Sequence, residues 1–364
     1  MNSSIRLLEL QGSSQKIGRA HGEAYRNEIR ELIQLLWENL SAYSPLALSR
    51  KAVLKMNMKN LPFTEEYGPD LVEEMRGISE GARVDFEEIF FLNSAFNLIN
   101  LGDIKSVLPL LGCTAFGVSA MERQHKKVFI GENYDIFKFF ERFTLLLRID
   151  DGIYPTALIY TIPGAIGHAG MNGRGIGVNV NYLCANDVRF GRISAVIIRK
   201  VLQSERIGDA VAAVITGRRA SGANYVIGDG EGNIFTIETS CGSYDILPSP
   251  HGIIGHANHY RSPLMRPYQV DRPNLIGDSI VRDYRMNQLL QEKRENLGLN
   301  QLMEVLRDHT NFPSSICFHG RGKEASSDGD VSTVVSMIQE LNARTLHMCK
   351  SLPCKQEFIQ FSVE

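Results

Sequence analysis

The hydrophobic periodicity of the chain changes at about Gly112. Before this point, apolar residues recur at intervals of three and four positions, which is typical of amphipathic helices. After it, short runs rich in β-branched and aromatic residues are separated by turn-forming residues, which is typical of strands. The sequence therefore predicts a helical N-terminal segment followed by a sheet-forming part. The expected helices are 14–40, 64–78 and 85–98, and the expected strands are 114–120, 128–134, 143–149, 156–161 and 175–182.

Helical and extended patterns continue to alternate in the second half of the chain. Blocks of strands separated by blocks of helices favour an α+β fold with antiparallel sheets in layers. Because no Pro/Gly/Ser-rich linker or low-complexity stretch divides the chain, we expect one globular unit. The helices expected here are 194–215, 277–295 and 299–308, and the strands are 224–227, 233–239, 244–247, 252–257, 331–339 and 345–349.

Charge and composition exclude several classes of protein. The 364 residues include 39 Lys and Arg against 41 Asp and Glu, a net charge of −2, whereas nucleic-acid and anionic-membrane partners require clustered basic residues. The longest weakly polar stretch, 106–120, is shorter than the roughly 20 residues of a membrane-spanning helix. The N-terminus lacks the features of a secretory signal, and six scattered cysteines form no disulfide framework. We therefore expect a cytoplasmic protein with reduced thiols.

The first candidate for chemistry is Cys113, which follows Gly112 at the change of periodicity. If the next two strands form a hairpin centred on Gln124, Asp135 returns opposite Cys113 and places a carboxylate beside the thiol. Buried cysteines are commonly inert small hydrophobes, so this arrangement alone does not identify a nucleophile.

Asparagine and histidine residues gather in two further segments. Strand alternation in 170–182 places Asn179 and Asn181 on one face, and this segment lacks the GxGxxG pattern of a nucleotide site. His256 and His259 lie at a strand end, without the third ligand or the HExxH pattern of a zinc site. The sequence therefore favours structural hydrogen bonding by these histidines.

Cys317 and His319 are a second cysteine and histidine pair. In an extended segment their side chains point the same way, which suits either a catalytic dyad or structural packing. Structural packing is the favoured interpretation.

Several of these motifs, in this order, resemble the isopenicillin-N acyltransferase family, also called the acyl-CoA:6-aminopenicillanic acid acyltransferases, of the N-terminal-nucleophile (Ntn) hydrolases. The resemblance covers most of the chain. The motifs that carry it are Gly112-Cys113-Thr114-Ala115-Phe116, Gly131-Glu132-Asn133-Tyr134-Asp135, residues 172–182, His256-Ala257-Asn258-His259, Leu306-Arg307-Asp308-His309 and Ser332-Thr333-Val334.

The resemblance implies a fold and a maturation step. The fold is a four-layer αββα sandwich of two antiparallel sheets with a mainly helical N-terminal segment. An inactive precursor cuts itself between Gly112 and Cys113, which gives a small chain, 1–112, and a large chain, 113–364, that stay associated. The mature enzyme forms an acyl-thioester on Cys113 and passes the acyl group to an amine or water, with a small acyl amide or acyl-CoA as substrate. Neither a cofactor nor a metal is implied.

The resemblance also implies roles for individual residues. Asp135 holds and polarises the amine and thiol of Cys113, and Asn258 donates to the oxyanion. Glu132 stands where the related bile-salt hydrolases have arginine, which favours the acyltransferase branch. Further candidate oxyanion or substrate contacts are Asn181, Asn133 and Thr114.

Two other functions fit the same residues. One is an uncleaved thiol hydrolase that pairs Cys317 or Cys113 with a histidine such as His259 or His319. The other is a binding protein that kept the fold without catalysis.

Overall fold

Two β-sheets form the centre of the molecule. The structure is a computed structural model that describes residues 4–43, 49–98, 112–119, 127–271, 273–320 and 331–364. The eight-stranded sheet has the order β1-β4-β5-β6-β7-β8-β9-β10. Its strands are β1 (Arg6–Gln11), β4 (Leu145–Asp150), β5 (Ala157–Thr161), β6 (Ala169–Asn172), β7 (Gly177–Leu183), β8 (Gly222–Gly228), β9 (Ile234–Thr239) and β10 (Tyr244–Leu247).

The second sheet has six strands in the order β11-β2-β3-β12-β13-β14. All its pairs are antiparallel, whereas β1 pairs with β4 in parallel in the other sheet. The strands are β2 (Gly112–Ser119), β3 (Val128–Phe137), β11 (Ile253–His256), β12 (Val331–Glu340), β13 (Thr345–Lys350) and β14 (Ile359–Ser362).

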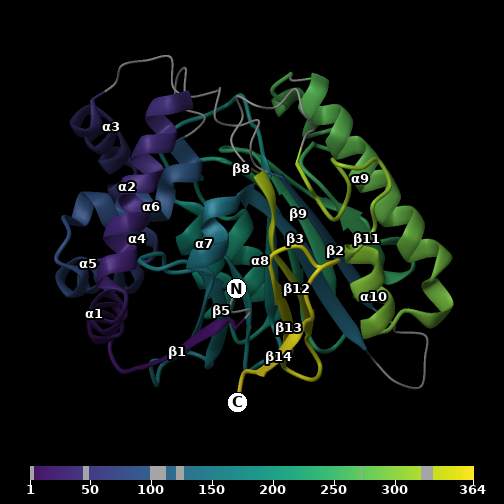
Figure 1. Ribbon diagram of the computed structural model, residues 1–364, viewed down its shortest axis with the longest axis horizontal. Helices are drawn as coiled ribbons and strands as arrows, with labels where there is room; N and C mark the ends of the chain where they lie inside the picture. The colour runs from purple at the N-terminus through teal and green to yellow at the C-terminus, as the bar shows by residue number, and fades with distance from the viewer. Residues whose placement is uncertain (1–3, 44–48, 99–111, 120–126, 272, 321–330) are drawn as a thin grey trace.

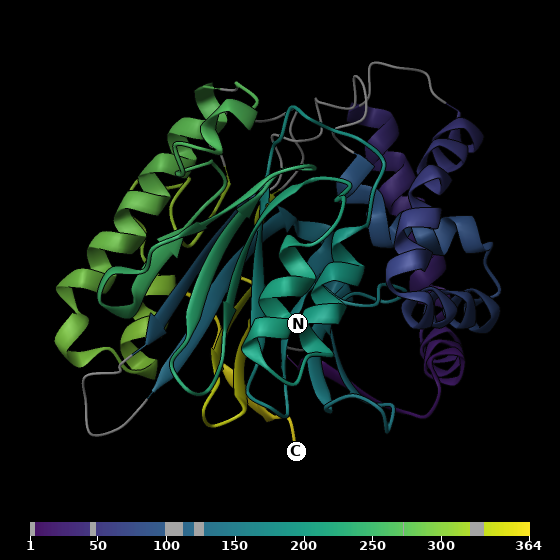
Figure 2. The ribbon, with the colours of Figure 1, turned by 180° about the vertical axis from the view of Figure 1, so that it is seen from behind.

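Helices cover the outer faces of both sheets (Figure 1). Helices α9 and α10 lie on the six-stranded sheet, and α7 and α8 lie on the eight-stranded sheet, as the view from behind also shows (Figure 2). The four-layer α+β arrangement expected from the family resemblance is therefore confirmed. The helices are α1 (Ser14–Ala24), α2 (Arg26–Tyr43), α3 (Arg50–Asn57), α4 (Leu61–Tyr67), α5 (Pro69–Ala82), α6 (Phe86–Leu98), α7 (Ser194–Leu202), α8 (Ile207–Ile215), α9 (Pro273–Glu292) and α10 (Leu299–Leu306).

The helical N-terminal segment is present, but its helices are shorter than the periodicity indicates. The expected helix 14–40 is interrupted at Tyr25, and the expected helix 64–78 overlaps α4 and α5, which are separated at Gly68. Strand β1, the short helix α3 and strand β14 were not expected. Each has few residues, so its local pattern is weak and its pairing or packing partner decides its structure.

The main core lies between the two sheets, where side chains of both pack together. Ala115 and Ile130 of the six-stranded sheet belong to the same buried cluster as Val226 of the eight-stranded sheet. Phe116 and Val118 point away from the eight-stranded sheet and pack against Met286 of α9. Strand β2 is thus buried on both faces, and its alternation decides which residues face the second sheet and which face α9. No helix within the described ranges is long and apolar enough to cross a membrane.

Helices α1 and α5 pack at unusually close range through glycine. A Cβ atom built on Gly18 would lie 1.9 Å from the backbone oxygen of Glu74, a distance that no side chain can occupy. We expect Gly18→Ala to lower the free energy of unfolding by about 1–3 kcal/mol, because the helices must separate. Urea denaturation measures the change. Gly208→Ala is the matched control in α8, where the added Cβ meets nothing within 4 Å and equal or higher stability is expected. Equal stability of the two variants would contradict this prediction.

Candidate active site

Cys113 lies near the start of β2, with its side chain in the space between the sheets. Gly112 pairs with Asp135, and Cys113 pairs with Tyr134. The expectation that Asp135 lies opposite Cys113 is therefore wrong by one residue. Opposed residues of an antiparallel pair share a face, so the Cys113 and Tyr134 side chains face the second sheet while Asp135 faces α9. The loop that sets this register, 120–126, falls outside the described residues.

A largely apolar cavity adjoins the Cys113 thiol. It contains about 750 Å³ of empty space, part of it open to solvent. Cys113 itself is 2% exposed. Burial raises the pKa of its thiol well above the usual value, and the nearby Glu132 and Asp135 raise it further, so the thiol is protonated in the uncut chain. The lining residues come from α6, β3, β7, α7 and the segment 162–168, and they include Leu92, Tyr134, Ile162, His168, Val180, Tyr182, Ala195 and Ile198.

Asp135 is fully buried on the other face of the hairpin. Thr333 donates to its Oδ1 at 2.6 Å, and the Thr333 hydroxyl in turn accepts from the backbone N–H of Phe318 at 2.9 Å. Burial raises the pKa of Asp135 to about 7, while Arg282 and the Thr333 hydrogen bond act in the opposite direction. Among the described residues, its Oδ2 has no hydrogen-bond partner.

The free oxygen of Asp135 is directed toward the backbone at the expected cleavage point. A Cβ built on Gly112 would lie 3.1 Å from Asp135 Oδ2. Glycine at this position therefore lets the carboxylate approach the backbone closely. The arrangement suits an interaction of Asp135 with backbone groups of residues 112 and 113 and separates it from the Cys113 side chain.

Arg282 of α9 is a central residue of the site that the sequence analysis did not single out. Its side chain is 4% exposed, and Nη1 donates to the Cys113 carbonyl and to Thr114 Oγ1, both at 2.7 Å. Its Nη2 donates to Asn258 Oδ1 at 2.9 Å. A signal was present, since Arg282 shares the spacing of the buried positions Ser279 and Met286. A charged residue on the buried stripe of a helix indicates a specific partner.

Asn258 connects three parts of the site. Its Oδ1 accepts from the Cys113 backbone N–H at 2.9 Å as well as from Arg282. Its Nδ2 donates to the Tyr182 carbonyl at 3.0 Å, and Ser279 of α9 accepts from its backbone N–H. An amide NH₂ carries two hydrogens, so one remains for an oxyanion once the Tyr182 bond is formed.

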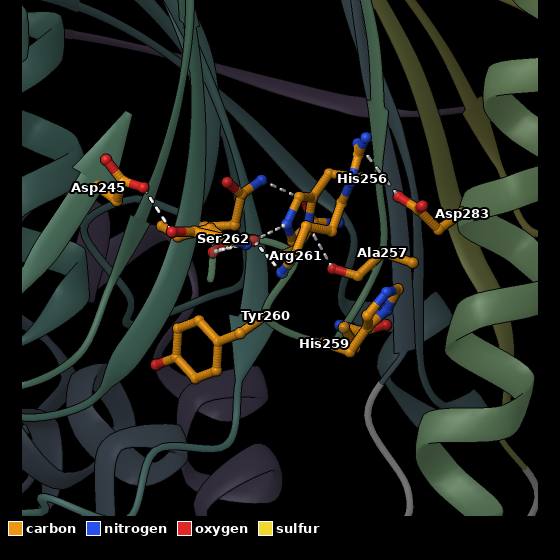
Figure 3. Close-up of polar contacts among 12 residues, drawn as sticks. Asp245, His256, Ala257, His259, Tyr260, Arg261, Ser262 and Asp283 are labelled. Atoms are coloured by element: carbon orange, nitrogen blue, oxygen red, sulfur yellow. Dashed lines mark hydrogen bonds and ion pairs between the residues drawn. The ribbon is translucent and has the colours of Figure 1, made fainter. Parts of the chain in front are cut away.

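The segment that carries Asn258 is fixed by buried and partly buried polar contacts (Figure 3). His256 Nε2 lies 2.8 Å from Glu238 Oε1, and both side chains are fully buried. Arg261 pairs with Asp283 of α9 at 3.5 Å. His259 Nδ1 lies 2.8 Å from the hydroxyl of Ser279, and burial lowers the pKa of this histidine to about 4. These contacts hold the turn after β11 between β9 and α9.

The remaining candidate residues have different surroundings. Asn181 Nδ2 is buried with no hydrogen-bond partner in the part of the chain that the structure describes, whereas its Oδ1 accepts from Asn224. Asn133 Nδ2 donates to two backbone carbonyls, Leu306 and Ile316, both at 2.8 Å. Asn181 thus offers a spare donor, and Asn133 serves to join β3 to the chain around α10.

Thr114 of β2 and Glu132 of β3 lie on opposite faces of the hairpin that these two strands form. Thr114 Oγ1 accepts from Arg282 and helps to orient the guanidinium. Glu132 accepts from the backbone N–H of Val180, and burial raises its pKa to about 8. At neutral pH most of the Glu132 carboxyl groups are therefore protonated.

Two solved structures align with part of this chain. A mutant of conjugated bile acid hydrolase from Clostridium perfringens aligns with a TM-score of 0.45 and 11% identity, covering 68% of this chain and 96% of the other. Penicillin V acylase from Agrobacterium tumefaciens aligns with a TM-score of 0.41 and 12% identity, covering 69% of this chain and 86% of the other.

Sequence comparison assigns the family. The family model for acyl-coenzyme A:6-aminopenicillanic acid acyl-transferase matches residues 121–353, which is more than half of the chain. A relative from Emericella nidulans, acyl-coenzyme A:6-aminopenicillanic-acid-acyltransferase 40 kDa form, is 26% identical over 320 residues, which cover 84% of this chain and 83% of the relative. The chain therefore belongs to the acyl-coenzyme A:6-aminopenicillanic acid acyl-transferase family of enzymes.

Proposed function

We propose that this chain is a self-cleaving cysteine N-terminal-nucleophile acyltransferase or amidohydrolase with Cys113 as its nucleophile. One observation carries the proposal. The Cys113 thiol lines an apolar cavity, while the N–H and carbonyl of the same residue are held by Asn258 and Arg282. A nucleophile whose backbone is fixed by buried polar groups is prepared for a reaction at its own peptide bond.

Self-cleavage begins at the bond between Gly112 and Cys113. Cys113 Sγ attacks the Gly112 carbonyl carbon, a carbon–sulfur bond forms, and the carbon–nitrogen bond breaks. The thiol proton is transferred to the departing nitrogen, which becomes the α-amino group of Cys113. Water then hydrolyses the thioester and frees the Gly112 carboxylate and the Cys113 thiol. The products are a small chain, 1–112, and a large chain, 113–364.

The new amine then serves the mature enzyme as a base. A free α-amino group has a pKa of about 7.7–8.0, so near neutral pH it can take the proton of its own thiol. Asp135 Oδ2 holds this amine from the α9 side, and Asn258 Oδ1 accepts a second hydrogen from it. The second hydrogen of Asn258 Nδ2 and the spare donor of Asn181 are available to a tetrahedral oxyanion.

The cavity suits an acyl group as the part of the substrate that binds next to Cys113. Its lining is mostly aliphatic and aromatic, and burial of apolar substrate atoms there is favourable. The acyl group passes from an acyl-CoA or a small acyl amide to Cys113 as a thioester, and then to an amine or water. After cleavage the two chains stay together, because β1 of the small chain pairs along its length with β4 of the large one.

Intact mass measurement under denaturing conditions tests the proposal on the full chain. We expect two species, with N-termini at residues 1 and 113, and an acyl-thioester adduct on the larger one after brief exposure to an acyl-CoA or an acyl amide. A single uncut chain that transfers acyl groups at full rate would overturn the proposal.

Thr333 provides a test of the role of Asp135 through pH. Ionised Asp135 holds the amine, so kcat/KM is expected to rise with pH through about 7. Thr333→Val removes a hydrogen bond that favours the ionised carboxyl, so the pKa of Asp135 increases and the rise moves to higher pH. The expected displacement is about one to two pH units, since a hydrogen bond to a charged group contributes roughly 1.5–3 kcal/mol. Thr216→Val, an exposed site directly after α8, is the control, and an unmoved profile in Thr333→Val would contradict this role.

A further inference from the structure

Four side chains with metal-binding atoms gather outside the set of residues that line the Cys113 cavity. His309 follows α10, Cys317 and His319 lie in the segment before β12, and Cys354 follows β13. Their ligand atoms all lie within 4.8 Å of one another. Three separate parts of the chain therefore bring two thiols and two imidazoles to one point.

The distances match those between the ligands of one tetrahedral ion. His319 Nε2 lies 3.1 Å from His309 Nε2, 3.5 Å from Cys317 Sγ and 3.4 Å from Cys354 Sγ. Around a tetrahedral zinc with usual bond lengths, two nitrogens are about 3.3 Å apart, and a nitrogen and a sulfur are about 3.6 Å apart. The three distances to His319 Nε2 thus fit a coordination shell, and the remaining pairs of ligand atoms lie within 4.8 Å of each other.

Hydrogen bonding among these groups does not account for the arrangement. A neutral imidazole nitrogen has either one hydrogen or one lone pair, so it makes one well-directed hydrogen bond. Three close partners nevertheless converge on Nε2 of His319. A cation at the centre would resolve this conflict, because each of the four atoms would direct a lone pair toward it.

We propose that Cys317, Cys354, His309 and His319 bind one structural Zn²⁺ ion. Two thiolates and two neutral imidazoles are a common zinc ligand set, and the thiolates offset the charge of the ion. Binding releases the two thiol protons to solvent, with no change in oxidation state. Four protein ligands complete the coordination, so the ion has no open position for a substrate and is structural. His309 is exposed and gives the ion a path from solvent.

The zinc would fasten the segment that supports the active-site strands. Phe318 lies between two of the ligands, and its N–H donates to the hydroxyl of Thr333, the residue that holds Asp135. The carbonyl of Ile316 accepts from Asn133 of β3. A zinc ion would hold these contacts in place by joining residues 309–319 to the chain after β13. The metal site itself does not depend on whether the chain cuts itself.

Metal content of the purified full chain, prepared without a histidine tag, tests the proposal. Elemental analysis is expected to find about one zinc per chain. His309→Ala and Cys354→Ser are expected to weaken zinc binding more than about 100-fold, because even partners outside the coordination shell contribute roughly 10–100-fold. The matched controls are His251→Ala, an exposed histidine, and Cys184→Ser, a partly exposed cysteine, which should both retain zinc.

Cobalt binding gives a second readout, which does not depend on the metal that the protein retains through purification. Co²⁺ added to the chelator-treated protein is expected to give the intense visible bands of a tetrahedral ion and the charge-transfer band of a cobalt thiolate. Cys354→Ser should weaken the charge-transfer band, while Cys184→Ser should leave it unchanged. Absence of zinc in the wild type together with absence of these bands would overturn the proposal, and so would a disulfide between Cys317 and Cys354 found by mass spectrometry in the freshly prepared protein.

Discussion

Cys113→Ala is expected to leave one uncut chain and to lower acyl transfer by roughly a millionfold, the scale on which a hydrolase responds to loss of its covalent nucleophile. The Cys113→Ala substitution removes the sulfur atom that reacts and no other reacting group. The fold should survive, because a buried cysteine packs as a small hydrophobe and alanine fills most of the same space. Intact mass and the initial rate with an acyl-CoA donor measure the two effects.

Cys241→Ala is the matched control, since Cys241 is also fully buried, and burial raises the pKa of its thiol to about 12. The control variant should be cut and should transfer acyl groups at the wild-type rate. Cleavage of the Cys113→Ala chain between residues 112 and 113 would contradict the assignment of the nucleophile. Cys113→Ser separates self-cleavage from acyl transfer, because a hydroxyl can still attack but is a poorer nucleophile than a thiolate. We expect slow cleavage and little acyl transfer in this variant.

The hairpin of β2 and β3 shows how far the sequence determines the site. Periodicity predicted both strands and brought Cys113 and Asp135 to the same end of the hairpin. It missed the register by one residue, because the turn carries no Asn-Gly or similar signal that fixes the loop. In a strand, one residue is the difference between two faces, so the error placed the carboxylate on the thiol side of the sheet.

Long-range contacts account for the other differences. The role of Arg282 depends on α9 crossing the end of β2, a contact between residues 169 positions apart that no local pattern encodes. The four proposed zinc ligands extend from residue 309 to residue 354 without a paired Cys-x-x-Cys spacing, so sequence analysis singled out only the neighbours Cys317 and His319. Asn133 was grouped with the substrate contacts by its motif, but the structure directs its amide to two backbone carbonyls.

Arg282→Met is expected to slow cleavage by about 100-fold, because Arg282 fixes the backbone of the nucleophile through the Cys113 carbonyl and a misplacement of about 1 Å in the reacting groups costs a rate factor of this size. Methionine keeps much of the volume of the side chain but donates no hydrogen bond. The Cys113 carbonyl, the Thr114 hydroxyl and Asn258 Oδ1 then lose a buried charged partner. The pKa of Asp135 also rises above 7, because the charge of Arg282 is the main influence that lowers it.

A purely structural role for Arg282 would reduce stability without moving the pH profile of kcat/KM. The profile therefore separates this structural role from an electrostatic effect of Arg282 on Asp135. Arg282→Lys keeps the charge and loses the planar fork, and it should restore the pH profile toward wild type while cleavage stays slow. Arg285→Met is the control one turn away on α9, where a partly exposed pair with Asp308 is lost and stability should change by about 1 kcal/mol or less. Cleavage of Arg282→Met at the wild-type rate with an unmoved pH profile would mean that Arg282 only packs α9 against β2. In the expected case, α9 supplies the positive charge that lowers the pKa of Asp135 toward neutral pH and fixes the backbone of the nucleophile.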